Sequence, residues 1–182
     1  MSMVIRQAGR TCTDERKIEA FLSKTKTGFL GLIDNETPYV LPLNYVWSNG
    51  SIYIHGAAEG RKIDILRNQP NACFTVSEEY GTIADPIPAM TDTAFMSVIV
   101  SGTAEFITDL DEATSVMQAM LNKYVPGYYN APLSKSHVDR YRSSLGSKTL
   151  VIKITPEKLT AKEHPLDESM KYYPGRNVQS DL

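Results

Sequence analysis

The stretch that decides the fold is YVLPLNYVWSNGSIYIHGAAEGRK, residues 39–62. It opens with a run of strand-forming residues that ends at Trp47. The Asn49-Gly50 pair that follows is the dipeptide most favoured in two-residue hairpin turns. Alternating side chains then resume over residues 51–55. The sequence therefore predicts a β-hairpin of fixed register over residues 40–55.

Small residues and two cations follow this hairpin. Residues 56–60, GAAEG, have little side-chain bulk, and Arg61 and Lys62 begin a helical pattern that ends near Asn68. Free backbone N–H groups and the positive end of a helix dipole favour an anion, and two cationic side chains add to that preference. The pattern predicts a phosphate site, with a solvated helix start as the alternative. The spacing is not that of a P-loop, because three residues rather than four separate the glycines and isoleucine follows the lysine.

Two residues of the hairpin each allow two interpretations. Pro42 has no N–H for a ladder, so its strand is either a plain edge strand or is bulged, and a bulge would free the backbone of residues 41–44 for a planar ligand. The pleat puts Ile52 and Ile54 in the core and turns His55 outward. There the imidazole could reach a ring whose phosphate the helix start holds, or it could be an ordinary, partly exposed polar residue.

The remaining patterns predict a sheet with flanking helices. Strand patterns cover residues 27–33, 38–47, 51–55, 72–77, 94–107 and 148–155, the last of which is expected to close a barrel. Helical patterns cover residues 13–24, 61–68, 109–123 and 134–145. We expect a single domain with a core over about 13–155 and a C-terminal tail over 156–182, either docked or disordered. Residues 79–93 and 124–133 are predicted as loops, and the first of these could move over a site.

Length and composition limit the classes of function. The chain has 182 residues, 42% hydrophobic and 22% charged, which is ordinary for one domain with a core. Its net charge of −2 provides no positive electrostatic field that would attract nucleic acid. Its apolar runs predict neither a membrane span nor a secretory leader. Cys12 and Cys73 suit a reducing cytoplasm, with Cys73 as a small core residue. The three histidines show no metal-ligand spacing.

The strand pattern over residues 94–107, AFMSVIVSGTAEFI, is apolar on both faces in its middle, from Met96 to Val100. One face belongs to the core, and the other needs a different cover. A second copy of the chain in a two-fold dimer would supply that cover, and a helix of the same chain would also do so.

The residues quoted above resemble those of a known family. PYVLPLNYVWSNGSIYIHGAAEGRKIDILRNQPNACFTV, residues 38–76, and FMSVIVSGTAEFI, residues 95–107, are similar to the FMN-binding split barrels of the pyridoxamine phosphate oxidase superfamily. Within it they resemble the nitroimidazole-resistance (Nim-like) branch. The resemblance implies a mainly β fold, a six-stranded antiparallel split β-barrel with peripheral helices. It also implies a homodimer that binds FMN in two clefts at its interface.

Matched by position, the resemblance assigns cofactor-binding roles to Leu41, Pro42, Leu43, Asn44, Ile54, His55, Arg61, Lys62 and Ser97. Arg61 and Lys62 match the pair that holds the FMN phosphate, and residues 41–44 match the strand that lies along the isoalloxazine. His55 matches the active-site histidine of the Nim-like proteins and is the expected catalytic residue. Ser97 falls where the oxidases place a polar residue near the flavin.

These matches imply an FMN-dependent oxidoreductase, nitroreductase-like or oxidase-like, in the cytoplasm. FMN would take a hydride from a reductant such as a nicotinamide and pass electrons to a small organic acceptor such as a nitroaromatic. His55 would hold the acceptor or donate a proton. Oxidation of pyridoxamine phosphate is not expected, because Tyr39 and Asn44 stand where the oxidases proper carry basic side chains. The alternatives are a protein that binds flavin or haem without turnover, and a dimeric scaffold with a vacant cleft.

Overall fold

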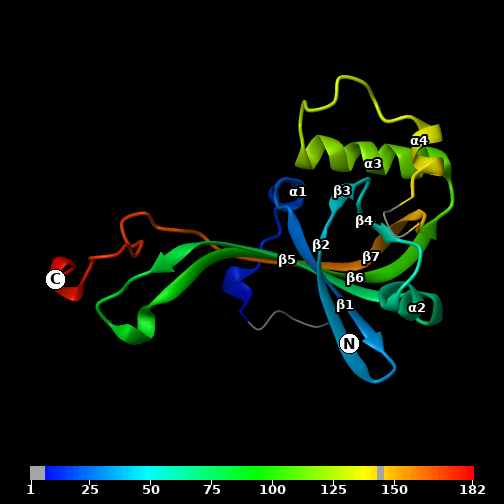
Figure 1. The fold of residues 1–182 in the computed structure, drawn as a ribbon. Helices are drawn as coiled ribbons and strands as arrows, with labels where there is room; N and C mark the ends of the chain where they lie inside the picture. The colour runs from blue at the N-terminus through cyan, green and yellow to red at the C-terminus, as the bar shows by residue number, and fades with distance from the viewer. Residues whose placement is uncertain (1–6, 143–145) are drawn as a thin grey trace.

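One antiparallel sheet forms the body of the computed structural model, which describes residues 7–142 and 146–182 (Figure 1). The strands lie in the order β2-β1-β5-β6-β7-β4-β3. Their bounds are β1 Thr27–Asp34, β2 Thr37–Asn44, β3 Val46–Ser48, β4 Ser51–Ala57, β5 Asn71–Ile83, β6 Asp92–Ile107 and β7 Thr149–His164. The predicted fold class, mainly β with peripheral helices and consistent with a split barrel, is confirmed.

In the described parts of the chain four α-helices accompany the sheet: α1 Glu15–Lys24, α2 Arg61–Asn68, α3 Leu110–Tyr124 and α4 Lys135–Arg140. Short 3-10 turns occur at η1 Ala8–Arg10, η2 Pro88–Met90 and η3 Val178–Ser180. The helix predicted over 134–145 is reduced to α4, and its last three predicted residues lie outside the described parts of the chain. None of the helices in those parts is long and apolar enough to cross a membrane.

Tyr45 separates β2 from β3 and corrects the predicted strand number from six to seven. Its side chain is fully buried, and its hydroxyl donates to the Leu22 carbonyl (2.8 Å). Its backbone N–H donates to the Tyr124 hydroxyl (2.9 Å), so this N–H is not available to a strand ladder. The predicted strand 38–47 is therefore two strands, which lie at opposite edges of a sheet that does not close.

The two faces of β4 contribute to two different cores. Ile52 and Ile54 lie in the main core, between the curved sheet, α1 and α2. Tyr53, on the other face, packs under α3 in a smaller core and is only 2% exposed. Its hydroxyl donates to Glu112 of α3 (2.9 Å). The face of β4 that was expected to point outward, the face of His55, is therefore covered by a helix.

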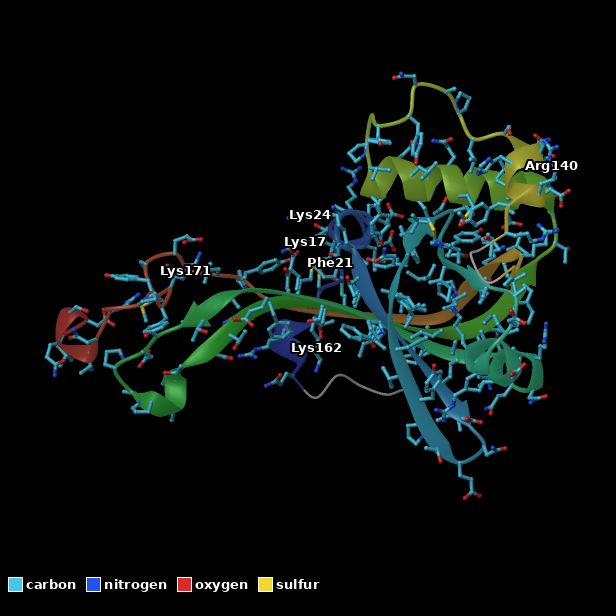
Figure 2. The ribbon with its side chains drawn as sticks, viewed as in Figure 1. Lys17, Phe21, Lys24, Arg140, Lys162 and Lys171 are labelled. Atoms are coloured by element: carbon cyan, nitrogen blue, oxygen red, sulfur yellow. The ribbon has the colours of Figure 1, made fainter. Side chains whose placement is uncertain are left out.

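Strands β5, β6 and β7 continue past the barrel as a long ribbon (Figure 1). The pairing of β5 with β6 extends to Ile83↔Asp92, so both ends of the predicted loop 79–93 are strand, and residues 84–91 connect the two strands of a hairpin. We call this extension, residues 79–95, together with the C-terminal segment 165–182, the arm. Figure 2 shows Lys171 on the arm and Arg140 at the opposite end of the molecule.

β7 continues to His164, nine residues past the predicted end at residue 155. Pro156 pairs with Gly102 beside an irregularity in the β6–β7 register, which is a place where a sheet tolerates proline. The C-terminal segment leaves the sheet only after His164.

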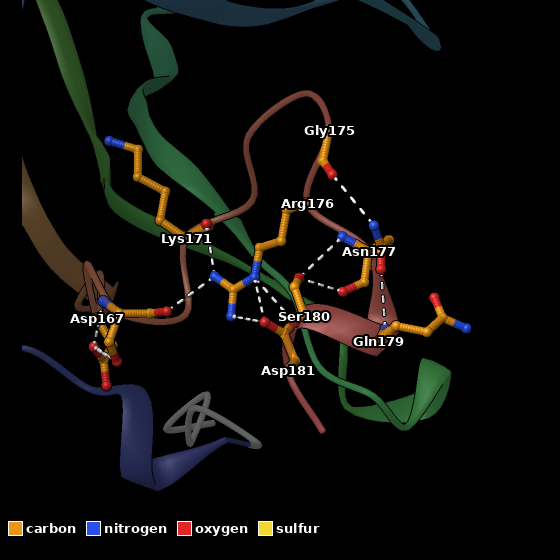
Figure 3. A network of polar contacts seen from close by, with 9 residues as sticks. Asp167, Lys171, Gly175, Arg176, Asn177, Gln179, Ser180 and Asp181 are labelled. Atoms are coloured by element: carbon orange, nitrogen blue, oxygen red, sulfur yellow. Dashed lines mark hydrogen bonds and ion pairs between the residues drawn. The ribbon is translucent and has the colours of Figure 1, made fainter.

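The C-terminal segment is docked on the arm. Ala84 N–H donates to the Met170 carbonyl (2.8 Å), and Tyr172 N–H donates to the Thr82 carbonyl (2.8 Å). Inside the segment, Arg176 forms an ion pair with Asp181 and donates to two backbone carbonyls (Figure 3). Of the two predicted alternatives for the tail, the docked one is observed.

Candidate functional site

Lys62 and His55 lie close together where β4 ends and α2 begins. The Lys62 ammonium rests against the backbone of Gly56, where an added Cβ would come within 2.8 Å of Nζ. Lys62 is half-buried, and this burial lowers its pKa. Burial also lowers the pKa of His55, and the positive charge of Lys62 lowers it further. The imidazole is therefore neutral near pH 7.

Neither side chain has its polar groups satisfied within the described residues. His55 Nδ1 is buried and has no hydrogen-bond partner there. Lys62 takes part in no hydrogen bond or ion pair among those residues. A buried donor or acceptor without a partner costs about 1–3 kcal/mol. The pair therefore marks a place where a polar or anionic group of a ligand would complete the site.

Arg61 is arranged differently from Lys62, although the two are neighbours in the chain. Its Nε donates to Asp34 Oδ2 (2.8 Å), and its guanidinium carbon lies 4.4 Å from the centre of the Tyr39 ring. These contacts tie Arg61 to the β1–β2 hairpin. The structure thus directs Lys62 to the end of β4, where its charge acts on His55, and directs Arg61 to the β1–β2 hairpin.

The β2 residues predicted to lie along a ring divide between the two faces of the strand. Leu41 and Leu43 pack against the main core, whereas Pro42 and Asn44 are exposed. The pairing of β2 with β1 is regular throughout, so β2 is a plain edge strand and Pro42 causes no bulge. An edge strand still has unpaired backbone groups along its free side.

The open gap of the barrel lies between β2 and β4, which contact each other but are not neighbours in the ladder. β3 pairs with β4 in the register Val46↔Tyr53. The predicted residues of β2 and β4 lie on strands that contact each other across this gap.

Ser97 does not join them within one chain. His55 is paired with Val151, which is in turn paired with Ile107, ten residues from Ser97 along β6. At about 3.3 Å per residue this separation is about 30 Å, more than one flavin spans. Ile54 is fully buried in the main core.

A cavity of about 510 Å³ opens beside His55 under the helices. It is lined by His55, Met117, Leu121, Tyr129, Ala131, Pro132, Leu133, Ser134, His137, Val138, Tyr141 and Thr149. Residues from Tyr129 to Ser134, most of them in the predicted loop 124–133, form one wall. Sequence analysis missed this cavity. The apolar run over residues 131–133 in an otherwise irregular segment was the available signal.

Cys73, predicted as a core residue, is exposed, and Cys12 is buried. Cys73 lies on β5 with its neighbours Ala72 and Phe74 pointing into the core. The alternation of the strand therefore turns Cys73 to the outer face of the sheet.

Comparison with known proteins identifies the family of the chain. The sequence profile of the pyridoxamine 5'-phosphate oxidase family matches residues 14–163. The chain belongs to this family. A separate search of curated protein sequences gave no match.

Solved structures with the same fold include proteins of three organisms. A Bacteroides thetaiotaomicron protein assigned to 5-nitroimidazole antibiotic resistance is 25% identical, with a TM-score of 0.65 over 84% of this chain and 85% of that chain. A flavocytochrome from Azotobacter vinelandii is 23% identical, with a TM-score of 0.74 over 95% of this chain and 79% of that chain. An FAD- and haem-binding protein from Mycobacterium smegmatis is 16% identical, with a TM-score of 0.70 over 88% and 77%. The latter two show the fold alone, and the first supports the resemblance to the nitroimidazole-resistance branch.

Proposed function

We propose that the chain is an FMN-binding flavoprotein that holds the cofactor's phosphate at Lys62 and its ring between β2 and His55. One observation carries the proposal. Lys62 is a half-buried ammonium without a counter-ion among the described residues, and its positive charge acts on His55, whose buried Nδ1 has no partner there either. A phosphate of charge about −2 would supply the missing negative charge. The family match supports a flavin over other phosphate-bearing molecules.

The residues around Lys62 fit such a phosphate. The carbonyl of Gly60 accepts the amides of Ile63 and Asp64, so the preceding amides of the α2 start are left for a ligand. Gly60 has a φ of 101°, a conformation that favours glycine, and this allows the chain to turn directly into the helix. A bound flavin supplies hydride acceptance and electron transfer.

His55 would position the electron acceptor. Because burial and Lys62 lower its pKa, the imidazole is neutral above about pH 6.5, and it can donate or accept one hydrogen bond without carrying charge. This state suits a group that orients a substrate better than it suits a proton donor. The acceptor would be a small organic molecule such as a nitroaromatic, with a nicotinamide as reductant.

A homodimer would bring Ser97 to a flavin. Within one chain Ser97 is about 30 Å from the level of His55, so Ser97 would serve the cleft of the other subunit. The outer face of the sheet carries exposed apolar side chains suited to such pairing, Phe29, Val40 and Ile99. Mixing Lys62→Gln and Ser97→Phe variants tests this proposal, because one site in each mixed dimer would be intact. Recovery of activity that neither variant shows alone is expected, and no recovery in a mixture shown to exchange subunits would contradict the dimer site.

The decisive experiment is an absorption spectrum of the purified protein, followed by anaerobic titration with NADH or NADPH and then with a nitroimidazole. A flavin spectrum that bleaches with the nicotinamide and returns with the nitroimidazole is expected. His55→Ala should keep the flavin and slow the return at least tenfold. Bound flavin that no nicotinamide reduces would indicate binding without turnover.

Haem is a second candidate ligand, favoured by one observation. The cavity beneath the helices has two histidines, His55 and His137, among apolar side chains. Imidazole is a usual axial ligand of haem iron. A Soret band that His137→Ala removes would favour haem over flavin. The cytoplasmic location that we propose is supported by the two free cysteines.

A further inference from the structure

The cavity beneath α3 and α4 continues into a second, more open hollow at the surface. This hollow has a volume of about 380 Å³ and is lined by Ser134, Ser136, His137, Arg140 and Tyr141. Three of these residues, Ser134, His137 and Tyr141, also line the cavity of about 510 Å³. The two spaces therefore meet at α4, and we call them together the recess, with the cavity as its inner part and the hollow as its outer part.

The inner and outer parts of the recess differ in chemistry. None of the described residues that line the inner part is an aspartate, glutamate, lysine or arginine. Six of those twelve residues are apolar, namely Met117, Leu121, Ala131, Pro132, Leu133 and Val138. The outer part has hydroxyl groups, an imidazole and the guanidinium of Arg140, with no aliphatic side chain among its described lining residues. A ligand that fills both parts is therefore apolar at one end and polar at the other.

An excess of positive charge surrounds the outer part of the recess. Residues 134–148 contain four lysines and arginines and one aspartate, in a chain whose net charge is −2. The two lysines, Lys135 and Lys148, form ion pairs with Asp111 and Asp139. The two arginines form no ion pair with any carboxylate among the described residues. The polar end of a matching ligand is therefore an anion.

Both arginines donate to backbone carbonyls instead of to carboxylates. Arg140 Nε donates to the Ser136 carbonyl (3.1 Å), and Arg142 donates to the carbonyls of Asp139 (2.9 Å) and Tyr141 (2.8 Å). A neutral carbonyl leaves the positive charge of a guanidinium uncompensated, and the planar guanidinium suits a carboxylate. Only Arg140 of the two lines the recess, and it lies at the helix-covered end of the molecule (Figure 2).

We propose that the recess binds an amphipathic carboxylate, a medium-chain fatty acid, with its apolar chain in the inner part and its carboxylate at Arg140. This site goes beyond the proposed flavin site, because Lys62 lines neither part of the recess. The inner volume of about 510 Å³ lies in the usual range of small-molecule sites, about 300–1,000 Å³. The aliphatic side chains of the inner part suit an aliphatic chain, and the flexible side chain of Met117 can adapt to it.

The wall and the mouth of the recess are held in place without a ligand. Leu133 N–H donates to Gln118 of α3 (2.6 Å), and the Ser134 hydroxyl accepts from His137 N–H (3.2 Å). The His137 ring stacks on Tyr141 with an interplanar angle of 23° and a centroid distance of 6.0 Å. A pre-formed recess loses little conformational freedom when a ligand enters, which favours binding.

The first test compares three probes, decanoate, octanoate and decylammonium, by calorimetry on the purified full-length protein at neutral pH. Decanoate should bind about tenfold or more tightly than decylammonium, which has the same chain length and the opposite charge. It should bind about fifteenfold more tightly than octanoate, because each buried methylene strengthens binding about fourfold. Equal or tighter binding of decylammonium would overturn the anion site, and equal affinity for the two carboxylates would overturn the apolar site for the chain.

A pair of neighbouring variants tests the contact with the carboxylate. Arg140→Gln should weaken decanoate binding about tenfold, because it removes the guanidinium that lines the recess. Arg142→Gln is the matched control: Arg142 lines neither part of the recess, so the loss should be less than about threefold. An equal loss in the two variants, or no loss in Arg140→Gln, would overturn the contact at Arg140.

Two further variants fill the inner part from different walls, Leu121→Trp and Ala131→Trp, so that a folding failure in one leaves the other to decide. Each should weaken decanoate binding about tenfold or more, because the indole takes the space of the chain. Met90→Trp is the matched control, since it adds the same side chain on the exposed arm and should leave decanoate binding unchanged. Unchanged decanoate binding in a folded cavity variant would overturn the site for the chain.

The fatty-acid site and the flavin site fail in distinguishable ways. Lys62→Gln should weaken FMN binding and leave decanoate binding unchanged, because Lys62 does not line the recess. Decanoate binding in a protein that takes up no flavin would support the recess and overturn the proposed function. Flavin without decanoate binding would overturn the recess alone, and a Soret band in a protein that takes up no decanoate would assign the inner part to haem.

Discussion

The two ends of the molecule differ in how they satisfy their cationic side chains (Figures 1 and 2). On the arm, Arg176 donates to both Asp181 oxygens and to the carbonyls of Ser169 and Lys171. At the helix-covered end, Lys62 is half-buried and His55 has a buried nitrogen, and neither finds a partner among the described residues. A satisfied network stabilises the fold, whereas an unsatisfied one indicates a ligand.

The largest effect is expected at Gly102, where β6 and β7 approach each other closely in the body of the sheet. A Cβ on Gly102 would lie 2.0 Å from the Thr155 carbonyl oxygen, in the middle of the sheet. Gly102→Ala should therefore force β6 and β7 apart and lower the free energy of unfolding by about 3 kcal/mol. Urea unfolding measures the loss. Gly9→Ala is the matched control, since a Cβ there meets no atom within 4 Å, and similar losses in both variants would contradict the explanation.

The next prediction distinguishes the contributions of the neighbouring cations Lys62 and Arg61 to FMN binding. Lys62→Gln should weaken FMN binding about 10- to 100-fold, because it removes a charge that lacks a partner in the described protein. Arg61→Gln should weaken it less than fivefold, since Arg61 is already paired with Asp34 and stacked on Tyr39. Fluorescence titration with FMN measures both affinities. An equal loss in the two variants would show that the phosphate draws Arg61 away from Asp34.

A third change addresses the arm alone. Arg176→Gln removes the ion pair with Asp181 and should release the segment 165–182, so that trypsin cleaves at Lys171 several times faster. FMN binding should stay the same. Glu168→Gln is the matched control, because the Lys171–Glu168 pair is exposed. Loss of FMN binding in Arg176→Gln would mean that the arm contributes to the site.

The smallest effect concerns Lys123, which has a hydrogen-bond partner and an aromatic neighbour but no ion pair with a carboxylate among the described residues. Lys123 Nζ donates to the Leu22 carbonyl (3.1 Å) and lies 3.9 Å from the centre of the Tyr45 ring, and burial lowers its pKa to about 8. Below pH 8 this lysine is protonated in both the folded and the unfolded state. Between pH 8 and 10.5 only the unfolded state keeps the proton, so stability should rise with pH.

The expected gain between pH 7.5 and 9.5 is about 1 kcal/mol after allowance for solvent screening. Urea unfolding at the two pH values measures it, and Lys123→Met should lack this gain. The same gain in the variant would assign the pH dependence to other groups.

Local sequence determined a large part of this fold. The Asn49-Gly50 turn, strands β1 and β4 and the start of α2 depend on residues close together in the chain, and each begins where it was predicted. The same residues led to the family. Their backbone conformations follow from steric preferences and side-chain periodicity that any short segment expresses.

Tertiary structure decided what lies around the predicted residues. Tyr124, 79 residues away, binds the backbone of Tyr45 and splits one predicted strand into two. α3 covers the face of β4 that the pleat alone turns outward, and this produces the cavity at His55. Asp34 and Tyr39 hold Arg61, whereas Lys62 has no such partner among the described residues. Each outcome depends on a contact between distant segments, and local preferences do not specify which distant groups will meet or which will keep an unsatisfied charge.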